Sequence, residues 1–215
     1  MTRIAAALLG AALVAAGPAQ AQSPRREHAL AALADGGDVQ ARRQGAGELA
    51  ETGTMADVPV LVQALRDPDT AVRVIAEAAL WAVWSRSGDA ETDRLLQIGV
   101  EQMNERSAPA AVETFSEVIR RAPDFAEGWN KRATAYFLLG DYRHSLADCD
   151  EVMKRNPYHY GALSGYGMIY LRLDLPARAL EYFEKALAVN PNLPQVQDTI
   201  EAIKSLLIQQ RKETT

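Results

Sequence analysis

The side chains best suited to chemistry in this chain lie far apart in the sequence. Its histidines are His28, His144 and His159, and none shows the H-x-x-x-H or H-E-x-x-H spacing of a metal site. Cys149 lies between Asp148 and Asp150, but side chains two positions apart on a helix diverge, so we expect no Cys–His–Asp site. The sequence also lacks a G-x-S-x-G motif, a P-loop and a Gly-rich dinucleotide turn. We therefore predict a protein with no catalytic site, no metal site and no cofactor.

Charge and cysteine content restrict the class of protein further. The formal net charge is −5 over 215 residues, without a basic run, so nucleic acid is not an expected partner. A single cysteine cannot form an internal disulfide, so the packing of apolar residues, 48% of the chain, must supply the stability. Cys149 itself is interpreted as a small buried apolar residue.

One constant spacing organises the elements that would position any functional side chain. Prolines, small residues and large apolar residues all recur three times at an interval of 34 residues, as from 123 to 157 to 191. The prolines are Pro123, Pro157 and Pro191; the small residues are Ala111, Ser145 and Ala179, and Gly99, Ala133 and Gly167; the large or apolar residues are Phe115, Cys149 and Phe183, and Leu95, Trp129 and Leu163. Such a fixed period is typical of an array of helical repeats, in which each proline follows the end of a helix.

This pattern resembles the tetratricopeptide repeat (TPR). Three copies fit at 92–125, 126–159 and 160–193, within a repeat region of residues 91–193. The first copy departs from the pattern, since Gln102 stands where the later copies carry Tyr136 and Tyr170. The resemblance implies an all-α, right-handed helical-repeat solenoid that binds a partner protein or peptide.

A second, weaker period of 31 residues, as from Asp38 to Asp69, runs through residues 28–88, within a predicted HEAT-like region of residues 28–90. The Asp-Pro-Asp turn at 67–69, followed by a Val-Arg pair, resembles the HEAT-type repeat. Asp69 suits a helix start, because its carboxylate can accept from free N–H groups there. We expect Arg73 to meet Asp69 or Asp38 and so link neighbouring repeats; the alternative is that these charges are solvated. Gly45 and Gly47 weaken the first copy, each by about 1 kcal/mol against alanine.

The helix expected over 70–85 is apolar around most of its circumference and carries Trp81 and Trp84. A helix of this kind is buried on several sides, so we interpret it as a wedge between the HEAT-like and TPR-like parts. The alternative is that the two tryptophans form an exposed binding patch. Because the joint at 85–90 is short, we expect the two parts to form one continuous superhelix.

Both ends of the chain are predicted to lie outside the repeats. Residues 1–21 have an apolar run after Arg3 and an A-x-A site, which indicates a secretory signal peptide cleaved after Ala21; the alternative is an uncleaved membrane anchor. Residues 22–27 are expected to be disordered. After the repeats, residues 194–211 form an amphipathic capping helix, and residues 212–215 a polar tail. The stripe of this helix is Val196, Ile200, Ile203 and Leu207.

The TPR resemblance also implies where a partner would bind, because the first helix of each pair lines the concave groove of the family. The matching positions here are Leu96, Val100, Met103, Glu127, Asn130, Thr134, Phe137, Ser164, Met168 and Leu171. Family members that grip a C-terminal carboxylate use several Lys and Arg residues there. Lys131 and Arg172 are near but off the counted positions, so such a clamp is not expected. The alternative for any single residue is packing or plain solvent exposure.

The predicted function is a non-enzymatic, periplasmic or secreted protein-interaction module that binds a partner segment in the concave groove. One alternative is a structural or assembly subunit of a cell-envelope complex, using its convex face or tryptophan helix. Another is an enzyme or cofactor carrier, for instance from the similarity of HEAT-like repeats to bilin lyases. The expected partner is a protein or peptide, with no nucleic acid and no stable membrane span after signal cleavage.

Overall fold

The computed structural model describes residues 24–34 and 38–213, which form eleven α-helices, one short 3-10 helix and no strand. This confirms the all-α prediction. The helices are α1 (Pro24–Ala34), α2 (Val39–Thr52), α3 (Val58–Ala64), α4 (Thr70–Trp84), α5 (Ala90–Asn104), α6 (Ala108–Arg121), α7 (Ala126–Leu138), α8 (Tyr142–Arg155), α9 (Tyr160–Arg172), α10 (Pro176–Val189) and α11 (Pro194–Glu213), with the 3-10 helix η1 (Met55–Asp57) before α3. The predicted signal peptide lies outside the described residues. Within them, no helix has the length and apolar character to cross a membrane.

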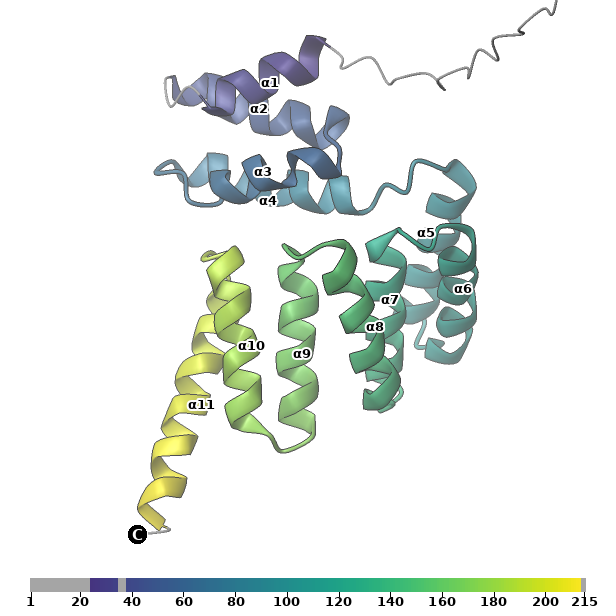
Figure 1. Ribbon diagram of the computed structural model, residues 1–215, viewed down its shortest axis with the longest axis vertical. Helices are drawn as coiled ribbons and strands as arrows, with labels where there is room; N and C mark the ends of the chain where they lie inside the picture. The colour runs from purple at the N-terminus through teal and green to yellow at the C-terminus, as the bar shows by residue number, and fades with distance from the viewer. Residues whose placement is uncertain (1–23, 35–37, 214–215) are drawn as a thin grey trace, which may run out of the picture.

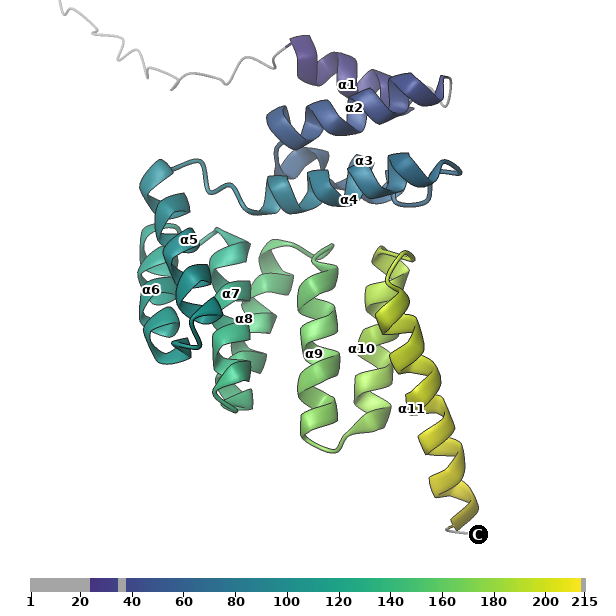
Figure 2. The same ribbon diagram turned by 180° about the vertical axis from the view of Figure 1, so that it is seen from behind.

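The helices form two layers that cross each other (Figure 1). Helices α1 to α4 stack with their axes across the view, and α5 to α10 run roughly at right angles beneath them (Figure 1). In the lower layer the pairs α5–α6, α7–α8 and α9–α10 pack closely, and α11 packs on α10. The same succession is seen from behind in Figure 2. The lower layer thus contains the three helix pairs that the repeat spacing predicts.

The recurring small residues allow the two helices of a pair to approach each other. A Cβ atom at Gly99 would lie 2.3 Å from the ring of Phe115, and one at Gly167 would lie 2.6 Å from the ring of Phe183. Both phenylalanines are buried in their pairs. Because a side chain at either glycine would overlap the ring, the aromatic residue can pack here only if its partner is glycine.

Helix α11 covers the last helix pair as a cap. Ile200 and Ile203 are buried in one cluster with Ala179 and Phe183, and Val196 and Leu207 pack against that cluster. The predicted apolar stripe therefore faces the repeat, as repeat arrays require at their ends. The helix extends to Glu213, slightly beyond the predicted boundary.

The prediction of one continuous superhelix is wrong, because the upper layer folds back over the turns of the lower one. Buried residues of α2, α3 and α4 share a single apolar cluster with Tyr160, Leu163 and Ala186 of the lower layer. Hydrogen bonds reinforce this contact: Asn192 Nδ2 donates to the Leu65 carbonyl over 2.7 Å. The short joint at 85–90 brings the two layers close in the sequence but does not fix the angle between them. Because α4 is apolar around most of its circumference, it is covered by helices of both layers.

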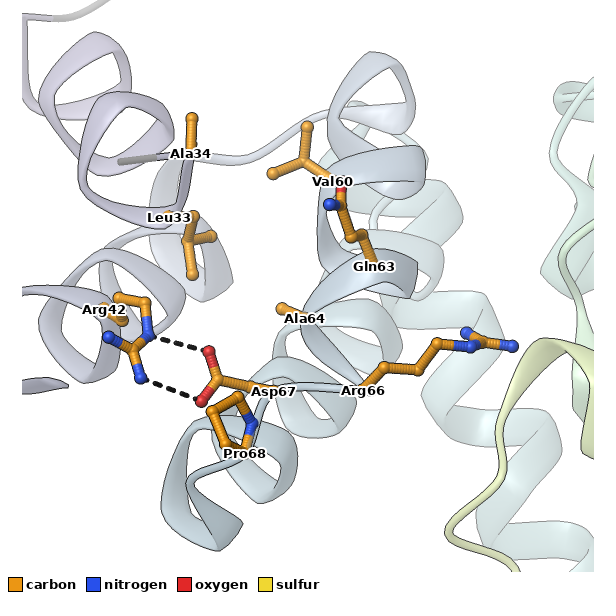
Figure 3. Close-up of a pocket in the computed structure, with 9 residues that line it drawn as sticks. All are labelled: Leu33, Ala34, Arg42, Val60, Gln63, Ala64, Arg66, Asp67 and Pro68. Atoms are coloured by element: carbon orange, nitrogen blue, oxygen red, sulfur yellow. Dashed lines mark hydrogen bonds and ion pairs between the residues drawn. The ribbon is translucent and has the colours of Figure 1, made fainter. Parts of the chain in front are cut away.

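Arg66 makes a second such link. Its guanidinium donates to the carbonyls of Ala188 and Val189 at the end of α10. Figure 3 shows the Arg66 side chain directed away from Arg42 and Asp67, although all three residues line one cavity. Arg66 therefore caps the carbonyl end of a helix in the other layer, where a cation is favoured.

Within the upper layer, arginines of α2 hold the turn that precedes α4. Arg42 pairs with Asp67 over 2.7 Å (Figure 3), and Arg43 pairs with Asp69 over 2.6 Å. Asp69 also caps α4 by accepting from the Val72 amide, as predicted. The prediction for Arg73 is wrong, because its guanidinium donates to the Asp67 and Pro68 carbonyls of its own turn. The charged link between neighbouring helices therefore comes from α2.

Helix α1 begins at Pro24, so residues 24–27, predicted to be disordered, are helical. Arg26 explains part of this, because it forms a bidentate pair with the buried Asp57 over 2.6 and 2.8 Å. Gly45 explains another part: a Cβ atom there would lie 2.7 Å from the Ala29 carbonyl oxygen. The glycine that weakens α2 by propensity thus allows α1 to pack closely against it.

Replacing Asp57 by Asn is expected to lower the free energy of unfolding by about 1–3 kcal/mol at neutral pH. Burial opposes ionisation of Asp57, but hydrogen bonds from Arg26 and Thr54 outweigh it, so the pKa of this carboxyl is lowered. A lowered carboxyl pKa stabilises the fold above the unfolded value of about 3.9, and this contribution is lost as the pH falls through the folded-state pKa. Urea unfolding across the acid range should show the wild-type advantage shrinking below about pH 4.

The matched control for this pH dependence is Glu51→Gln, because the partner of Glu51, Arg25, is exposed. Exposed pairs contribute roughly 0–1 kcal/mol, so the control should follow the wild type closely. A constant difference between wild type and Asp57→Asn down to about pH 2 would contradict the assignment.

Candidate binding groove

A cavity of about 280 Å³ opens between the second and third helix pairs. Helix α7 supplies one wall, α9 the other, and α8 the floor. The lining residues are Asn130, Ala133, Thr134, Phe137, Ser145, Cys149, Gly161, Ala162, Ser164, Gly165, Met168 and Ile169. Most of these side chains are apolar or small, so the cavity suits an apolar side chain with a few polar groups around it.

The cavity owes its space to Gly165. One repeat earlier, Lys131 occupies the same register, and in the first copy Gln97 does so. A Cβ atom at Gly165 would meet nothing closer than the Cys149 sulfur, at 3.8 Å. No neighbouring group fills the space that a side chain at position 165 would occupy, so the wall of α9 is open toward α7 there.

The structure brings together five of the ten predicted groove residues in this cavity: Asn130, Thr134, Phe137, Ser164 and Met168. Thr134 is exposed, and Met168 is 40% exposed. Sequence reasoning missed the floor, where Ser145 and Cys149 of α8 lie, and it did not include Gly165. The signal for Gly165 was the loss of a side chain at a register position that is otherwise occupied.

The other five predicted residues lie away from the cavity. Leu96 is buried in the first helix pair, and Val100 and Met103 pack against the same cluster around Phe115. Leu171 packs with the cluster that α11 closes. The remaining residue, Glu127, is 1% exposed and lies within the protein.

The polar groups at the rim can accept hydrogen bonds. The Thr134 hydroxyl donates to the Asn130 carbonyl over 3.0 Å, and the Ser164 hydroxyl donates to the Tyr160 carbonyl over 2.9 Å. Their protons are thereby engaged, while each oxygen retains lone pairs for an incoming N–H group. An extended peptide carries such N–H groups along its backbone.

Beneath the groove, Glu127 and His159 form a buried pair that joins the start of α7 to the N-cap of α9. The His159 Nδ1 atom accepts from the Ala162 amide over 3.0 Å, so it carries no proton, and the Nε2–H group donates to Glu127 over 2.9 Å. Lys131 lies 3.1 Å from the other oxygen of Glu127. Burial would raise the pKa of Glu127, but His159 and Lys131 outweigh it and lower that pKa. The carboxylate is therefore held ionised inside the protein.

The two cations near the groove are engaged with side chains of the chain itself. Lys131 pairs with Glu127, and the Arg172 guanidinium lies 5.9 Å from the ring centre of Phe137. Both side chains thus have partners within the chain. The exposed Arg172 also places a cation near the ring of Phe137 at the wall of the cavity.

Cys149 is 2% exposed, and burial with the charges of Asp148 and Asp150 raises the pKa of its thiol to about 12. The thiol is therefore neutral at ordinary pH and lacks the reactivity of a nucleophile. Asp148 points elsewhere, in a bidentate pair with Arg132 over 2.8 Å. Across the residues that the structure describes, no group of three or more His, Cys, Asp and Glu side chains could hold a metal ion.

The alternative of an exposed tryptophan patch is wrong. Trp84 is 2% exposed and stacks on His159 with ring centres 4.7 Å apart. Trp81 is half-buried and meets the edges of Trp84, His159 and Tyr160. These rings form the contact between the two layers, as the wedge interpretation of this helix requires.

Comparison with known proteins agrees with this scaffold. Residues 160–193 match the family model of the tetratricopeptide repeat. A TPR repeat-containing protein of Rhizobium etli is 37% identical over 126 residues, which is 59% of this chain and 61% of that protein. The chain thus spans less than two thirds of the length of this relative.

Solved structures share the fold at lower identity. The Sgt2 TPR domain from Aspergillus fumigatus superposes with a TM-score of 0.55 at 20% identity, over 58% of this chain and 83% of that domain. The first TPR of Spaghetti (RPAP3), bound to the HSP90 peptide SRMEEVD, superposes with a TM-score of 0.53 at 21% identity, over 56% of this chain and 96% of that one. Residues 160–193 thus match the tetratricopeptide repeat, and the solved structures share the fold of the repeat region.

Proposed function

We propose that this chain is a non-enzymatic protein-interaction module that binds an extended segment of a partner protein along the groove between α7 and α9. The observation that carries the proposal is the cavity at Gly165, which is open, largely apolar and not required for packing. Similarity to TPR proteins, one of which is solved with a bound peptide, supports protein binding in general.

The cavity suggests how the segment is held. An apolar side chain of the partner enters between Phe137 and Met168 and reaches Ile169, while backbone N–H groups approach the Thr134 and Ser164 hydroxyls. Met168 can adjust to the shape of that side chain, because its thioether chain is flexible. Since Lys131 and Arg172 are engaged within the chain, the segment binds through an internal apolar residue and not through its C-terminal carboxylate.

We place this interaction in the periplasm or outside the cell. The support is the sequence of residues 1–21, with its apolar run and A-x-A site. The upper layer of HEAT-like helices, in this proposal, holds the repeat array in one shape through the contacts of α4 with the turns below it.

Replacing Gly165 by Leu is expected to fill the cavity and weaken peptide binding at least tenfold. The backbone should not suffer, because a Cβ atom is accommodated at this position and leucine favours helix over glycine. Peptides selected from a random display library against the wild-type chain would provide the probes. Their affinities for wild type and variants would be measured by fluorescence anisotropy.

Two variants serve as matched controls. Gly165→Ala leaves most of the cavity open and should bind nearly as the wild type does. Gly47→Leu places the same side chain on α2, where a Cβ atom has similar room, with its nearest neighbour at 3.9 Å. Selected peptides that bind Gly165→Leu as tightly as they bind the controls would show that the groove is not the binding site.

A further inference from the structure

A second cavity, of about 260 Å³, lies where the two layers meet and is separate from the groove. It is bounded by the end of α4, the segment before α3, and the turns before α7 and α9. Its lining residues are Met55, Trp84, Arg86, Asp124, Phe125, Ala126, Arg155 and Asn156. At roughly 30 Å³ per water molecule, this space is large enough for a small organic group.

Two buried nitrogen atoms at this cavity have no hydrogen-bond partner among the described residues: Trp84 Nε1 and Asn156 Nδ2. Trp84 is 2% exposed and Asn156 is 1% exposed. The orientation of the Asn156 amide is set by its oxygen, which accepts from the Tyr158 N–H group over 3.2 Å. The Nδ2 donor is therefore the end that faces away from the turn. Two unpaired donors without an acceptor are costly inside a protein.

The equivalent turn one repeat later shows which group accepts a hydrogen bond from such an asparagine donor. Asn190 occupies the position of Asn156 in the next repeat and makes the same turn, its oxygen accepting from the Asn192 N–H group over 2.9 Å. The Asn190 Nδ2 atom, however, has a partner: it donates to the carboxylate of Glu77 over 3.2 Å. The hydroxyl of Tyr160 donates to the same oxygen.

The spacing along α4 explains why the two turns differ. Glu77 and Trp84 are separated by nearly two full turns of α4, so they lie on almost the same face of this helix. Glu77 thus meets the asparagine of one repeat junction, and Trp84 lies at the preceding junction. Where the later junction has a donor facing a carboxylate, the earlier one has two donors, Asn156 and Trp84.

One cation at this cavity, Arg86, can attract an anion. Arg86 donates to the carbonyls of Ala50 and Gly53, and it has no carboxylate partner in the part of the chain that the structure describes. Arg155 is paired with Glu151 over 2.6 Å, and Asp124 is the lining residue of opposite sign. Because Glu151 offsets the charge of Arg155, Arg86 is the lining cation that can attract an anion, with Asp124 as the opposing charge.

We propose that this cavity binds a carboxylate, whose oxygens accept from Trp84 Nε1–H and Asn156 Nδ2–H beside Arg86. The carboxylate belongs either to a small free organic acid or to a glutamate or aspartate side chain of a bound polypeptide. In either case it takes the place that the Glu77 carboxylate holds at Asn190. Binding here ties α4 to Asn156 near the end of the second repeat and so stiffens the contact between the layers.

The test follows the indole N–H signals of the three tryptophans by ¹H–¹⁵N NMR of the full chain. The probes are sodium succinate and sodium acetate as free acids, and N-acetyl-glutamate N-methylamide as a model of a side chain. Sodium chloride at equal ionic strength is the reference. We expect the Trp84 signal to shift and saturate by about 10 mM, as a millimolar Kd requires, while the Trp129 signal stays in place.

Two variants remove one donor each with little change of shape. Asn156→Asp keeps the oxygen that accepts from Tyr158 but replaces Nδ2 by an anionic oxygen, and Trp84→Phe keeps the ring on His159 but lacks the N–H group. Each should weaken binding at least tenfold by calorimetry, whereas Trp81→Phe, outside the cavity, should not. Gly165→Leu should also leave this binding intact, which separates it from the groove.

The arms of the titration distinguish the sources. Saturation by the free acids supports a small organic acid as the ligand, and saturation by the blocked glutamate alone supports a polypeptide side chain. The proposal is overturned if no carboxylate gives a saturable shift beyond that of chloride. It is overturned equally if Asn156→Asp and Trp84→Phe bind as the wild type does.

Discussion

Replacing His159 by alanine is expected to lower the free energy of unfolding by about 3–5 kcal/mol. The imidazole is fully buried, and its removal leaves the Glu127 carboxylate without its nearest hydrogen-bond donor inside the protein. The same change deletes the acceptor that caps α9 at Ala162 and the ring on which Trp84 stacks. The measurement is urea unfolding of both proteins at neutral pH, followed by circular dichroism.

His144→Ala is the matched control, because this histidine is exposed and bonds to Asp141 at the surface. It should change stability by less than about 1 kcal/mol. If the two alanine variants unfolded at similar urea concentrations, the Glu127–His159 pair would not hold α7 and α9 together.

Replacing Trp84 by alanine is expected to cost about 3–5 kcal/mol and to loosen the upper layer from the lower one. Trp84 lies in the cluster that unites α4 with Tyr160, Leu163 and Ala186, so the cavity left behind opens at the boundary between the layers. Hydrogen exchange should therefore quicken in α1 to α4 and at the turns beneath α4 more than in α5 and α6. Mass spectrometry of peptic fragments provides this measurement.

Trp129→Ala is the control for the loss of a tryptophan. Its indole N–H donates to the Pro123 carbonyl, and its half-buried ring lies 5.1 Å from the guanidinium of Arg132 and 4.8 Å from that of Arg155. Exchange in α1 to α4 should stay as in the wild type. Equal acceleration of α1 to α4 by both substitutions would contradict the assigned role of Trp84.

The helix pairs could be predicted from the sequence because their rules are local and repeat. Glycine at 99 and 167 leaves space for an aromatic ring on the second helix of its pair. The constant repeat spacing places both partners in register in the sequence. The cap was predictable for a similar reason, since its apolar stripe follows from helical period alone. Glycine propensity, by contrast, undervalued Gly45, whose role depends on the distance to Ala29 in another helix.

The crossing of the two layers could not be predicted in this way. It depends on contacts between residues that are distant in the sequence, such as Arg66 with the end of α10 and Asn192 with Leu65. No period links these residues, and the shortness of the joint at 85–90 does not set the angle across it.

The groove was predicted in part, because family register says which helix faces it but not what covers each position. Phe137 and Met168 lie at the cavity. Met103 and Leu171, which occupy the register of Phe137 in the other two repeats, pack instead on the first helix pair and on the cluster closed by α11. Glu127 also occupies a groove position of the register, but its side chain is buried in a hydrogen bond with His159 at the turn before α9. Neighbouring elements thus decide which positions of the register stay available.

Photo-crosslinking in the native host tests the central claim, that a partner segment binds between α7 and α9, most directly. A photoreactive residue would replace Met168 in the cavity, and, as the control, His144 on the exposed side of α8. We predict adducts with a distinct protein from position 168, absent from position 144 and lost when Gly165→Leu is added. Adducts that form equally from both positions, or that persist with Gly165→Leu, would contradict the account.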